Sequence, residues 1–143
     1  MIELSRTVLG NDILLEQLYM NFVNNKLTHS IIINGPKGMG KSTFAFSLII
    51  KIFNKLINKD EINKNINLVY NNTHPNIRYI YKEFDEKNNK YKKFITIDQI
   101  RNLENFLYQS SFDNLPKFII IDSADDLNKS SSNSLLKSLE EPK

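Results

Sequence analysis

The sequence predicts an α/β fold, in which short strands alternate with longer helices along the chain. Three runs, at residues 31–33, 77–81 and 117–121, are rich in isoleucine and aromatic residues, which is typical of buried strands. The segments between them place apolar residues at helical spacing. A chain of 143 residues is expected to form one domain with its own core.

Each element of the first half follows from a local pattern. Residues 1–11 read as an irregular lead-in that ends in a turn or helix cap. The apolar spacing of residues 13–23 predicts an amphipathic helix. Residues 42–57 contain no Gly or Pro and are apolar nearly all round, which predicts a helix covered on more than one side. The Asn- and Lys-rich residues 58–73 are expected to be a mobile surface excursion that could include a short helix.

A small β-hairpin is expected, with the run at residues 77–81 as its first strand. Residues 85–89 are a polar turn, and residues 91–97 read as a returning strand. The hairpin carries aromatic side chains among lysines, which could stack on nucleic-acid bases. Packing within the hairpin is the favoured interpretation. The aromatic residues are Tyr79, Tyr81, Phe84, Tyr91 and Phe94.

Two more helices are expected in the second half. Asp98 could cap a helix over residues 99–109, whose apolar residues share one face. The last helix begins at residue 128 or 129, covers residues 130–140 and is stopped by Pro142.

Residues 35–42 fit the pattern G-x-x-x-x-G-K-[ST] at each fixed position. Glycines let backbone N–H groups turn toward a polyphosphate, and the following helix adds the positive end of its dipole. Lys41 would place its ammonium on the outer phosphates, and Ser42 would offer its hydroxyl to Mg²⁺. The predicted nucleotide-binding residues are Gly35, Pro36, Lys37, Gly38, Met39, Gly40, Lys41, Ser42 and Thr43.

The alternative is a glycine-rich turn between a strand and a helix that binds nothing. The bare pattern occurs by chance in unrelated chains. A strand before it and a helix after it remove most accidental matches, so phosphate binding is the favoured interpretation.

Asp122 directly follows the apolar run at residues 118–121. After a phosphate loop, an acid in this position predicts a ligand of Mg²⁺, together with Ser42, although an Asp can also simply end a strand. Hydrolytic relatives of this class carry Glu at the next position, where it activates the attacking water. Here the residue is Ser123, whose hydroxyl cannot act as that base. Asp125 and Asp126 could replace it only if the loop turned them inward, and capping or charging the next helix is the favoured role.

Composition excludes several other classes of site. The chain has no cysteine, which excludes disulfides and thiolate metal sites. His29 and His74 lack metal-ligand spacing and are expected to serve in local hydrogen bonding and packing. A net charge of +3 permits contact with nucleic acid without requiring it. With no apolar signal core or membrane span, the expected location is the cytoplasm.

With these residues in view, the chain resembles the delta-prime subunits of bacterial DNA polymerase III clamp loaders, which belong to the AAA+ family. The most specific stretch is the tail, in which residues 121–128 lead to residues 133–142. Within it, Leu135-Leu136-Lys137-Ser138-Leu139-Glu140-Glu141-Pro142 is close to diagnostic of clamp-loader subunits. The other matching segments are Leu9-Gly10-Asn11, residues 29–42, His74-Pro75 and residues 97–101.

The resemblance implies a P-loop NTPase, AAA+-like, with a three-layer parallel sheet and flanking helices. It also implies ATP and Mg²⁺ as cofactors, and a place in a five-subunit ring that opens the sliding clamp and places it on primed DNA. Partners would be the motor and delta subunits. The motor subunit is expected to have Glu after the metal-binding Asp and a four-cysteine zinc module; with Ser123 and no cysteine, this chain resembles the zinc-free form of delta-prime.

The family's architecture continues beyond Lys143 with a sensor strand, a Ser-Arg-Cys motif, and lid and collar domains. Residues 1–143 would therefore be a truncated nucleotide-binding domain with an incomplete sheet. In that sheet, residues 31–33 lie between two later strands. Those strands come from elsewhere, or residues 117–121 pair with residues 31–33, or the isolated chain is unstable.

Three functions follow from these observations. The leading one is an ATP-binding, weakly or non-hydrolysing clamp-loader subunit. The second is a stand-alone ATPase or small-molecule kinase. The third is an interaction remnant that binds the motor subunit without nucleotide.

Overall fold

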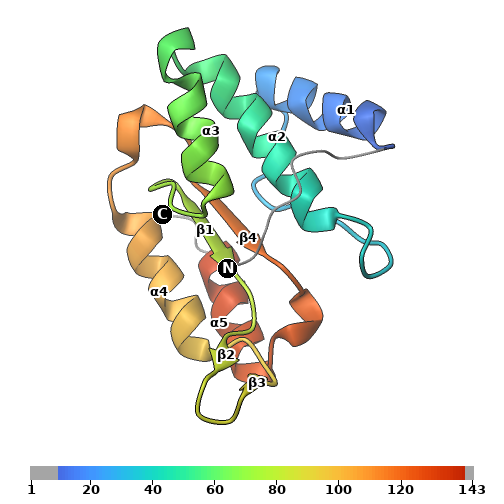
Figure 1. Cartoon of the computed structure of the whole chain (residues 1–143), viewed down its shortest axis with the longest axis vertical. Coiled ribbons are helices and arrows are strands. Elements are labelled where there is room, and N and C mark those ends of the chain that lie inside the picture. The colour runs from blue at the N-terminus through green and yellow to red at the C-terminus, as the bar shows by residue number, and fades with distance from the viewer. Residues whose placement is uncertain (1–9, 141–143) are drawn as a thin grey trace. The chain divides into compact units, whose positions relative to one another are not determined.

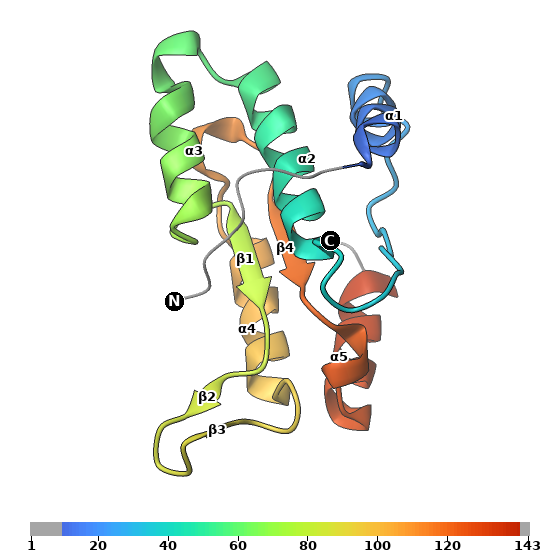
Figure 2. The ribbon, with the colours of Figure 1, turned by 45° about the vertical axis from the view of Figure 1, so that its right-hand side comes forward.

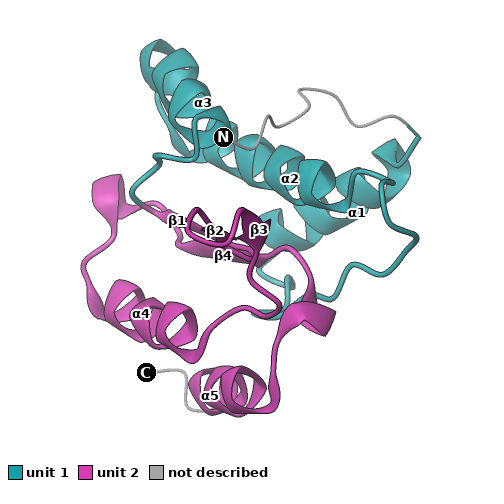
Figure 3. Ribbon diagram, turned by 60° about the horizontal axis from the view of Figure 1, so that its bottom comes forward, with its two compact units in different colours: residues 1–75 teal, residues 76–143 magenta. Residues whose placement is uncertain are grey.

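The computed structural model describes residues 10–140. The chain divides into two compact units, with the boundary between Pro75 and Asn76 (Figure 3). The predicted lead-in up to Leu9 and the predicted helix stop at Pro142 lie outside the described residues.

The first unit is helical, and its middle helix is the long apolar one. Helix α2 (Lys41–Leu56) packs against α1 (Asp12–Val23) and α3 (Ile62–Tyr70), as Figure 1 shows. Lys51 on α2 forms an ion pair with Glu16 on α1. The predicted helices at residues 13–23 and 42–57 are confirmed. The buried apolar side chains of α2 are Phe44, Phe46, Leu48, Ile49, Ile52 and Phe53.

The predicted strand at residues 31–33 is wrong. These residues join no sheet in the described part of the chain, and the side chains of Ile31 and Ile32 are 41% and 90% exposed. The β-branched composition favours a strand, but a strand needs a neighbour to pair its N–H and C=O groups. The candidate neighbour pairs through residues 118–121 with residues 77–80, and no second strand among residues 10–140 joins its other edge.

The expected polar excursion at residues 58–73 is largely a packed element. A 3₁₀ turn (Lys59–Glu61) leads into α3, on which Asn65 and Val69 are buried. The side chain of Asn65 donates to the carbonyl of Glu61 and hydrogen-bonds the His74 ring at 3.0 Å. The His74 ring also stacks on Phe53 with centroids 4.6 Å apart. The polar composition of this segment therefore gave no sign that one face of its helix is buried. The packing role predicted for His74 is confirmed.

The second unit contains the parallel pair of strands. β1 (Ile77–Ile80) pairs with β4 (Phe118–Ile121), and α4 (Ile97–Tyr108) packs against α5 (Lys129–Glu140), as Figure 2 shows. Side chains from the strands and both helices form its core. This confirms the mixed α/β class with parallel pairing, while the wider three-layer sheet stays a prediction. The core consists of Ile95, Ile100 and Leu103, with Ile80, Ile119, Ile121, Leu127 and Leu135 against them.

Asn76, which the sequence analysis did not identify, holds together the segments that lead into β1 and β4. Its side chain donates to the carbonyls of Phe112 (2.7 Å) and Leu115 (3.1 Å) and accepts from the N–H of Phe112 (2.8 Å). Its own carbonyl accepts from the N–H of Phe118 at 2.8 Å. A buried amide with these partners holds the loop before β4 against the start of β1.

The end of α4 is fastened to the start of β4 through Lys117. The ammonium of Lys117 donates to the carbonyls of Phe106 (2.6 Å), Leu107 (3.2 Å) and Gln109. It also lies 5.1 Å from the centroid of the Phe106 ring, and the Arg78 guanidinium lies 4.3 Å from the same centroid. A cation at these C-terminal carbonyls complements the helix dipole.

A hairpin forms around the predicted turn at residues 85–89, but the predicted pairing of its strands is wrong. β2 (Phe84–Asp85) pairs with β3 (Lys90–Tyr91), whereas β1 pairs with β4. The Asp85 carboxylate closes the turn, because it accepts from the N–H groups of Lys87 and Asn88 and from the Asn88 side chain. The expected returning strand at residues 91–97 is short because the N–H of Ile95 donates to the carbonyl of Asp126 and Ile97 already belongs to α4.

The predicted cap of α4 is also wrong. Thr96 caps the helix: its hydroxyl accepts from the N–H of Gln99 (3.4 Å), whose side chain accepts from the N–H of Thr96 (3.0 Å). Asp98 lies inside the first turn, 3.8 Å from Arg101. The Thr-x-x-Gln spacing of a capping box outweighs the lone Asp. The predicted start of α5 is confirmed, because Asn128 accepts from the N–H of Ser131 at 2.9 Å.

Candidate functional site

Residues 35–40 form a loop that leads directly into α2, whose first turn contains the motif residues Lys41, Ser42 and Thr43. Gly38 and Gly40 have φ angles of 87° and 74°, in the left-handed region that L-residues rarely adopt. A Cβ built at Gly38 would meet no atom within 4 Å. Glycine is therefore required at this position by backbone conformation rather than by lack of space.

The N-terminus of α2 has no side-chain cap from its N-cap residue. Gly40 is the N-cap residue and makes no side-chain cap, and the first turn contains no acidic residue. The first N–H groups of a helix and its dipole then favour negative charge in front of them. Ser42 and Thr43 are half-buried in this first turn, and Met39 before it is 62% exposed.

Lys41 folds back onto the loop. Its ammonium donates to the carbonyls of Gly35 (2.8 Å) and Pro36 (2.9 Å). The sequence motif predicts this cation but gave no sign of its carbonyl partners. A phosphate that uses Lys41 has to compete with these two charge-assisted hydrogen bonds.

Asp122 lies directly after β4. Its N–H donates to the carbonyl of Ile80 at 2.9 Å, which continues the pairing of β1 and β4 by one residue, and the residue is exposed. It belongs to the second unit, whereas the loop belongs to the first. A shared metal site of Ser42 and Asp122 therefore stays a prediction.

Of the two acids expected to act at the start of the last helix, Asp126 makes contacts within the fold. Ala124–Asp126 form a 3₁₀ turn, and the Asp126 carboxylate lies 3.0 Å from the ammonium of Lys82. The carbonyl of Asp126 accepts from the N–H of Ile95. Because Asn128 caps α5, the capping role expected for Asp126 is wrong, and its carboxylate is engaged with Lys82.

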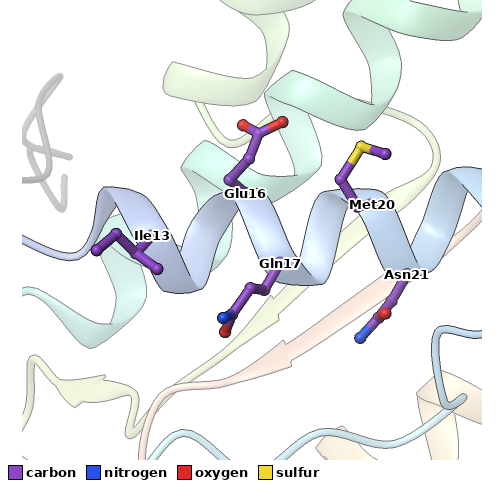
Figure 4. A pocket seen from close by; sticks show the side chains of 5 residues that line it. All are labelled: Ile13, Glu16, Gln17, Met20 and Asn21. Carbon is purple, nitrogen blue, oxygen red and sulfur yellow. The ribbon is translucent and has the colours of Figure 1, made fainter.

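Other sites are scarce in the described part of the chain. Residues 10–140 contain no group of three or more His, Asp or Glu side chains that could hold a metal ion. A shallow pocket of about 420 Å³ lies along α1 and contains no predicted site residue (Figure 4). Its side chains include one acid and no base, which does not suit a phosphate. They are Ile13, Glu16, Gln17, Met20 and Asn21.

Among residues 10–140, no helix is both long enough and apolar enough to cross a bilayer.

Comparison with known families gives a match that extends far beyond the loop. Residues 10–143 match the family described as DNA polymerase III, delta subunit. The matched range includes the glycine-rich loop, Asp122 and the C-terminal leucine-rich segment. A search of curated proteins finds no match. The relationship therefore concerns nearly the whole sequence rather than one motif.

Proposed function

Because the chain belongs to the DNA polymerase III delta subunit family, we propose that it is a clamp-loader subunit that binds ATP and hydrolyses it weakly or not at all. The observation that carries the proposal is the loop at residues 35–43. It combines two left-handed glycines, an uncapped helix N-terminus and a lysine whose ammonium lies within the loop.

The polyphosphate of ATP would bind in this loop. The N–H groups at the start of α2 and the ammonium of Lys41 supply positive charge without a competing acid in the first turn. Lys41 would exchange its carbonyl partners for phosphate oxygens. The motif residues Gly35 to Thr43 would all line the bound phosphates.

Mg²⁺ fits the two residues proposed for it. Ser42 offers a hydroxyl oxygen and Asp122 a carboxylate oxygen, and Mg²⁺ prefers oxygen ligands with several retained waters. When bound, the ion would neutralise part of the charge on the phosphates. No thiolate exists in the chain, so the proposal includes no zinc.

Hydrolysis by this chain is proposed to be weak or absent. The position after Asp122 is Ser123, which has no group to take a proton from water near neutral pH. Asp126 is bound to Lys82 and serves the fold of the second unit. ATP would then act as a bound ligand rather than as a substrate for hydrolysis.

In the assembly, the chain would act as delta-prime. Its direct partners would be the motor and delta subunits, and it would meet the sliding clamp and primed DNA through the complex. A subunit of the replication machinery would work in the cytoplasm. The Ser at position 123 supports delta-prime over the motor subunit.

Titration with a fluorescent ATP analogue tests the binding proposal. We expect Mg²⁺-dependent binding that Lys41→Ala weakens about 10- to 100-fold, because a charge-assisted contact is worth about 1.5–3 kcal/mol. Lys55→Ala, an exposed lysine in the last turn of the same helix, is the matched control and should bind as the parent chain does. No Mg²⁺-dependent affinity, or equal affinity in Lys41→Ala, would refute the proposal.

The contact of Lys41 with two carbonyls favours one other function, an interaction subunit that binds no nucleotide. The Lys41 ammonium already has hydrogen-bond partners without a phosphate, so the loop does not require ATP, and the chain could bind the motor subunit alone. A pull-down with the motor subunit, in the absence of ATP, that survives Lys41→Ala would favour this function. Turnover by the purified chain that is lost in Asp122→Asn would instead favour a stand-alone ATPase or kinase.

A further inference from the structure

The β2–β3 hairpin exposes flat aromatic surface. Phe84 and Tyr91 face each other across the two strands, with ring centroids 5.2 Å apart and an edge-to-face angle of 77°. Such a pair leaves at least one face of each ring outside the contact. The two side chains are 47% and 64% exposed, and the hairpin extends beyond the end of β1 (Figure 2). The contact between the two rings therefore leaves part of each ring accessible to a ligand.

The same hairpin carries an excess of unpaired positive charge. Lys82 and Lys92 form ion pairs with Asp126 and Glu83. Three more lysines are exposed and have no ion pair with any residue in the described range. They are Lys87, Lys90 and Lys93.

The acids of the hairpin do not cancel this excess. Glu83 is bound to Lys92, and the Asp85 carboxylate accepts three hydrogen bonds from the turn that it closes. Glu86 is the remaining acid between residues 82 and 94. The hairpin therefore has three exposed lysines without an ion pair and one acid, Glu86, that could offset their charge.

We propose that this hairpin binds single-stranded nucleic acid, with bases stacked on Phe84 and Tyr91 and phosphates bound by Lys87, Lys90 and Lys93. Unpaired bases are required, because bases in a duplex already stack on each other. An acidic peptide would use the lysines but leave the rings in water. An apolar protein surface would use the rings but desolvate the lysines, which costs free energy.

Phe94 extends the surface toward α4. Its side chain is 38% exposed, and the ammonium of Lys93 lies 5.3 Å from the centroid of its ring. An aromatic ring and a lysine thus recur on the segment that leaves β3. The proposal rests on the hairpin and not on the nucleotide loop, so the two can fail separately.

Fluorescence anisotropy with a labelled oligonucleotide of about 20 thymidines tests the stacking, since single-strand sites cover about 4–16 nucleotides. Tyr91→Leu keeps an apolar contact with Phe84 but removes the flat ring. We expect it to weaken binding about 5- to 100-fold, whereas Tyr91→Phe should stay within about twofold of the parent chain. Equal binding by Tyr91→Leu and the parent chain would overturn the proposal.

A triple variant, Lys87→Gln with Lys90→Gln and Lys93→Gln, tests the phosphate contacts. Its plot of log affinity against log salt should be shallower by about 2, since each phosphate contact on a single strand contributes about 0.7 to the slope. The matched control replaces Lys55, Lys59 and Lys64, three exposed lysines of the first unit, and should leave the slope unchanged. Equal slopes in the two triple variants would contradict the assignment.

Competition by polyglutamate or duplex DNA, and binding by Lys41→Ala, distinguish the proposed site from a purely charged surface and from the loop of the first unit. If polyglutamate or duplex DNA displaces the oligonucleotide as well as unlabelled single strand does, the hairpin is a charged surface only, and the proposal is wrong. Lys41→Ala should bind the oligonucleotide normally. Loss of binding in that variant would assign the nucleic acid to the loop of the first unit and overturn the hairpin site.

Discussion

Helix α4 begins with Thr96, whose side chain and that of Gln99 satisfy each other's backbone N–H groups, whereas α2 begins with Gly40, which has no side chain to offer. Both helices are long and carry a buried apolar face, so the difference does not arise from their length or packing. At α4, the chain closes the helix start with its own atoms. At α2, no side chain of the N-cap residue caps the helix start, and two left-handed glycines precede the first turn. The contrast teaches that a helix start can be closed by side chains or left without a side-chain cap, and the proposed phosphate binding at α2 would require the second arrangement.

Gly40→Ala should have the largest effect of the changes that probe this contrast. The left-handed backbone at this position costs an L-residue about 1–2 kcal/mol, so urea unfolding should occur at lower denaturant concentration. The added Cβ would meet Thr43 at 3.9 Å, an ordinary contact, so the loss would come from conformation. Gly40→Asn, which tolerates this conformation better, is the control and should lose less. An unfolding midpoint equal to that of the parent chain would show that the loop does not depend on this glycine.

Thr96→Ala should come next. Removal of the capping hydroxyl should lower the free energy of unfolding by about 1 kcal/mol, and Thr96→Ser should retain most of it. Affinity for the ATP analogue should not change, because the Thr96 cap serves the second unit only. If the nucleotide affinity fell with stability, the two helix starts would not have separate roles.

The smallest effect is expected at Asp85, where a side chain also holds backbone N–H groups, in this case those of a turn. The hydrogen bond from the Asn88 side chain, followed by that from its N–H group, holds the pKa of Asp85 below its ordinary value of 3.8. The turn is therefore fully stabilised above that value and loses this contribution as the pH falls through the lowered folded-state pKa. Amide chemical shifts of Lys87 and Asn88 should move in this range, and Asp85→Asn should abolish the movement. Shifts that are flat across the range would show that the carboxylate does not hold the turn.

Sequence patterns predicted those features that depend on nearby residues. Helical spacing located α1, α2, α4 and α5, and the apolar runs located β1 and β4. The glycine motif located the loop, and the family assignment carried by residues 121–142 is confirmed by the match over residues 10–143. Each of these signals is contained within a few turns of helix or one short segment.

The wrong predictions share a different origin. The isoleucines at residues 31–33 have strand composition, but pairing depends on a partner that composition does not reveal. The returning strand of the hairpin ends early because the N–H of Ile95 donates to the carbonyl of Asp126, and the buried face of α3 includes the contact between Asn65 and His74. The metal site is not among the wrong predictions and stays a prediction, because Ser42 and Asp122 lie in separate units.

The contacts of Lys117 link two elements of the second unit at one point. Its ammonium joins the last turn of α4 to the start of β4, and the other end of the same strand leads into Asp122. The end of the helix and the start of the strand are therefore held together by hydrogen bonds as well as by the segment that connects them in the sequence.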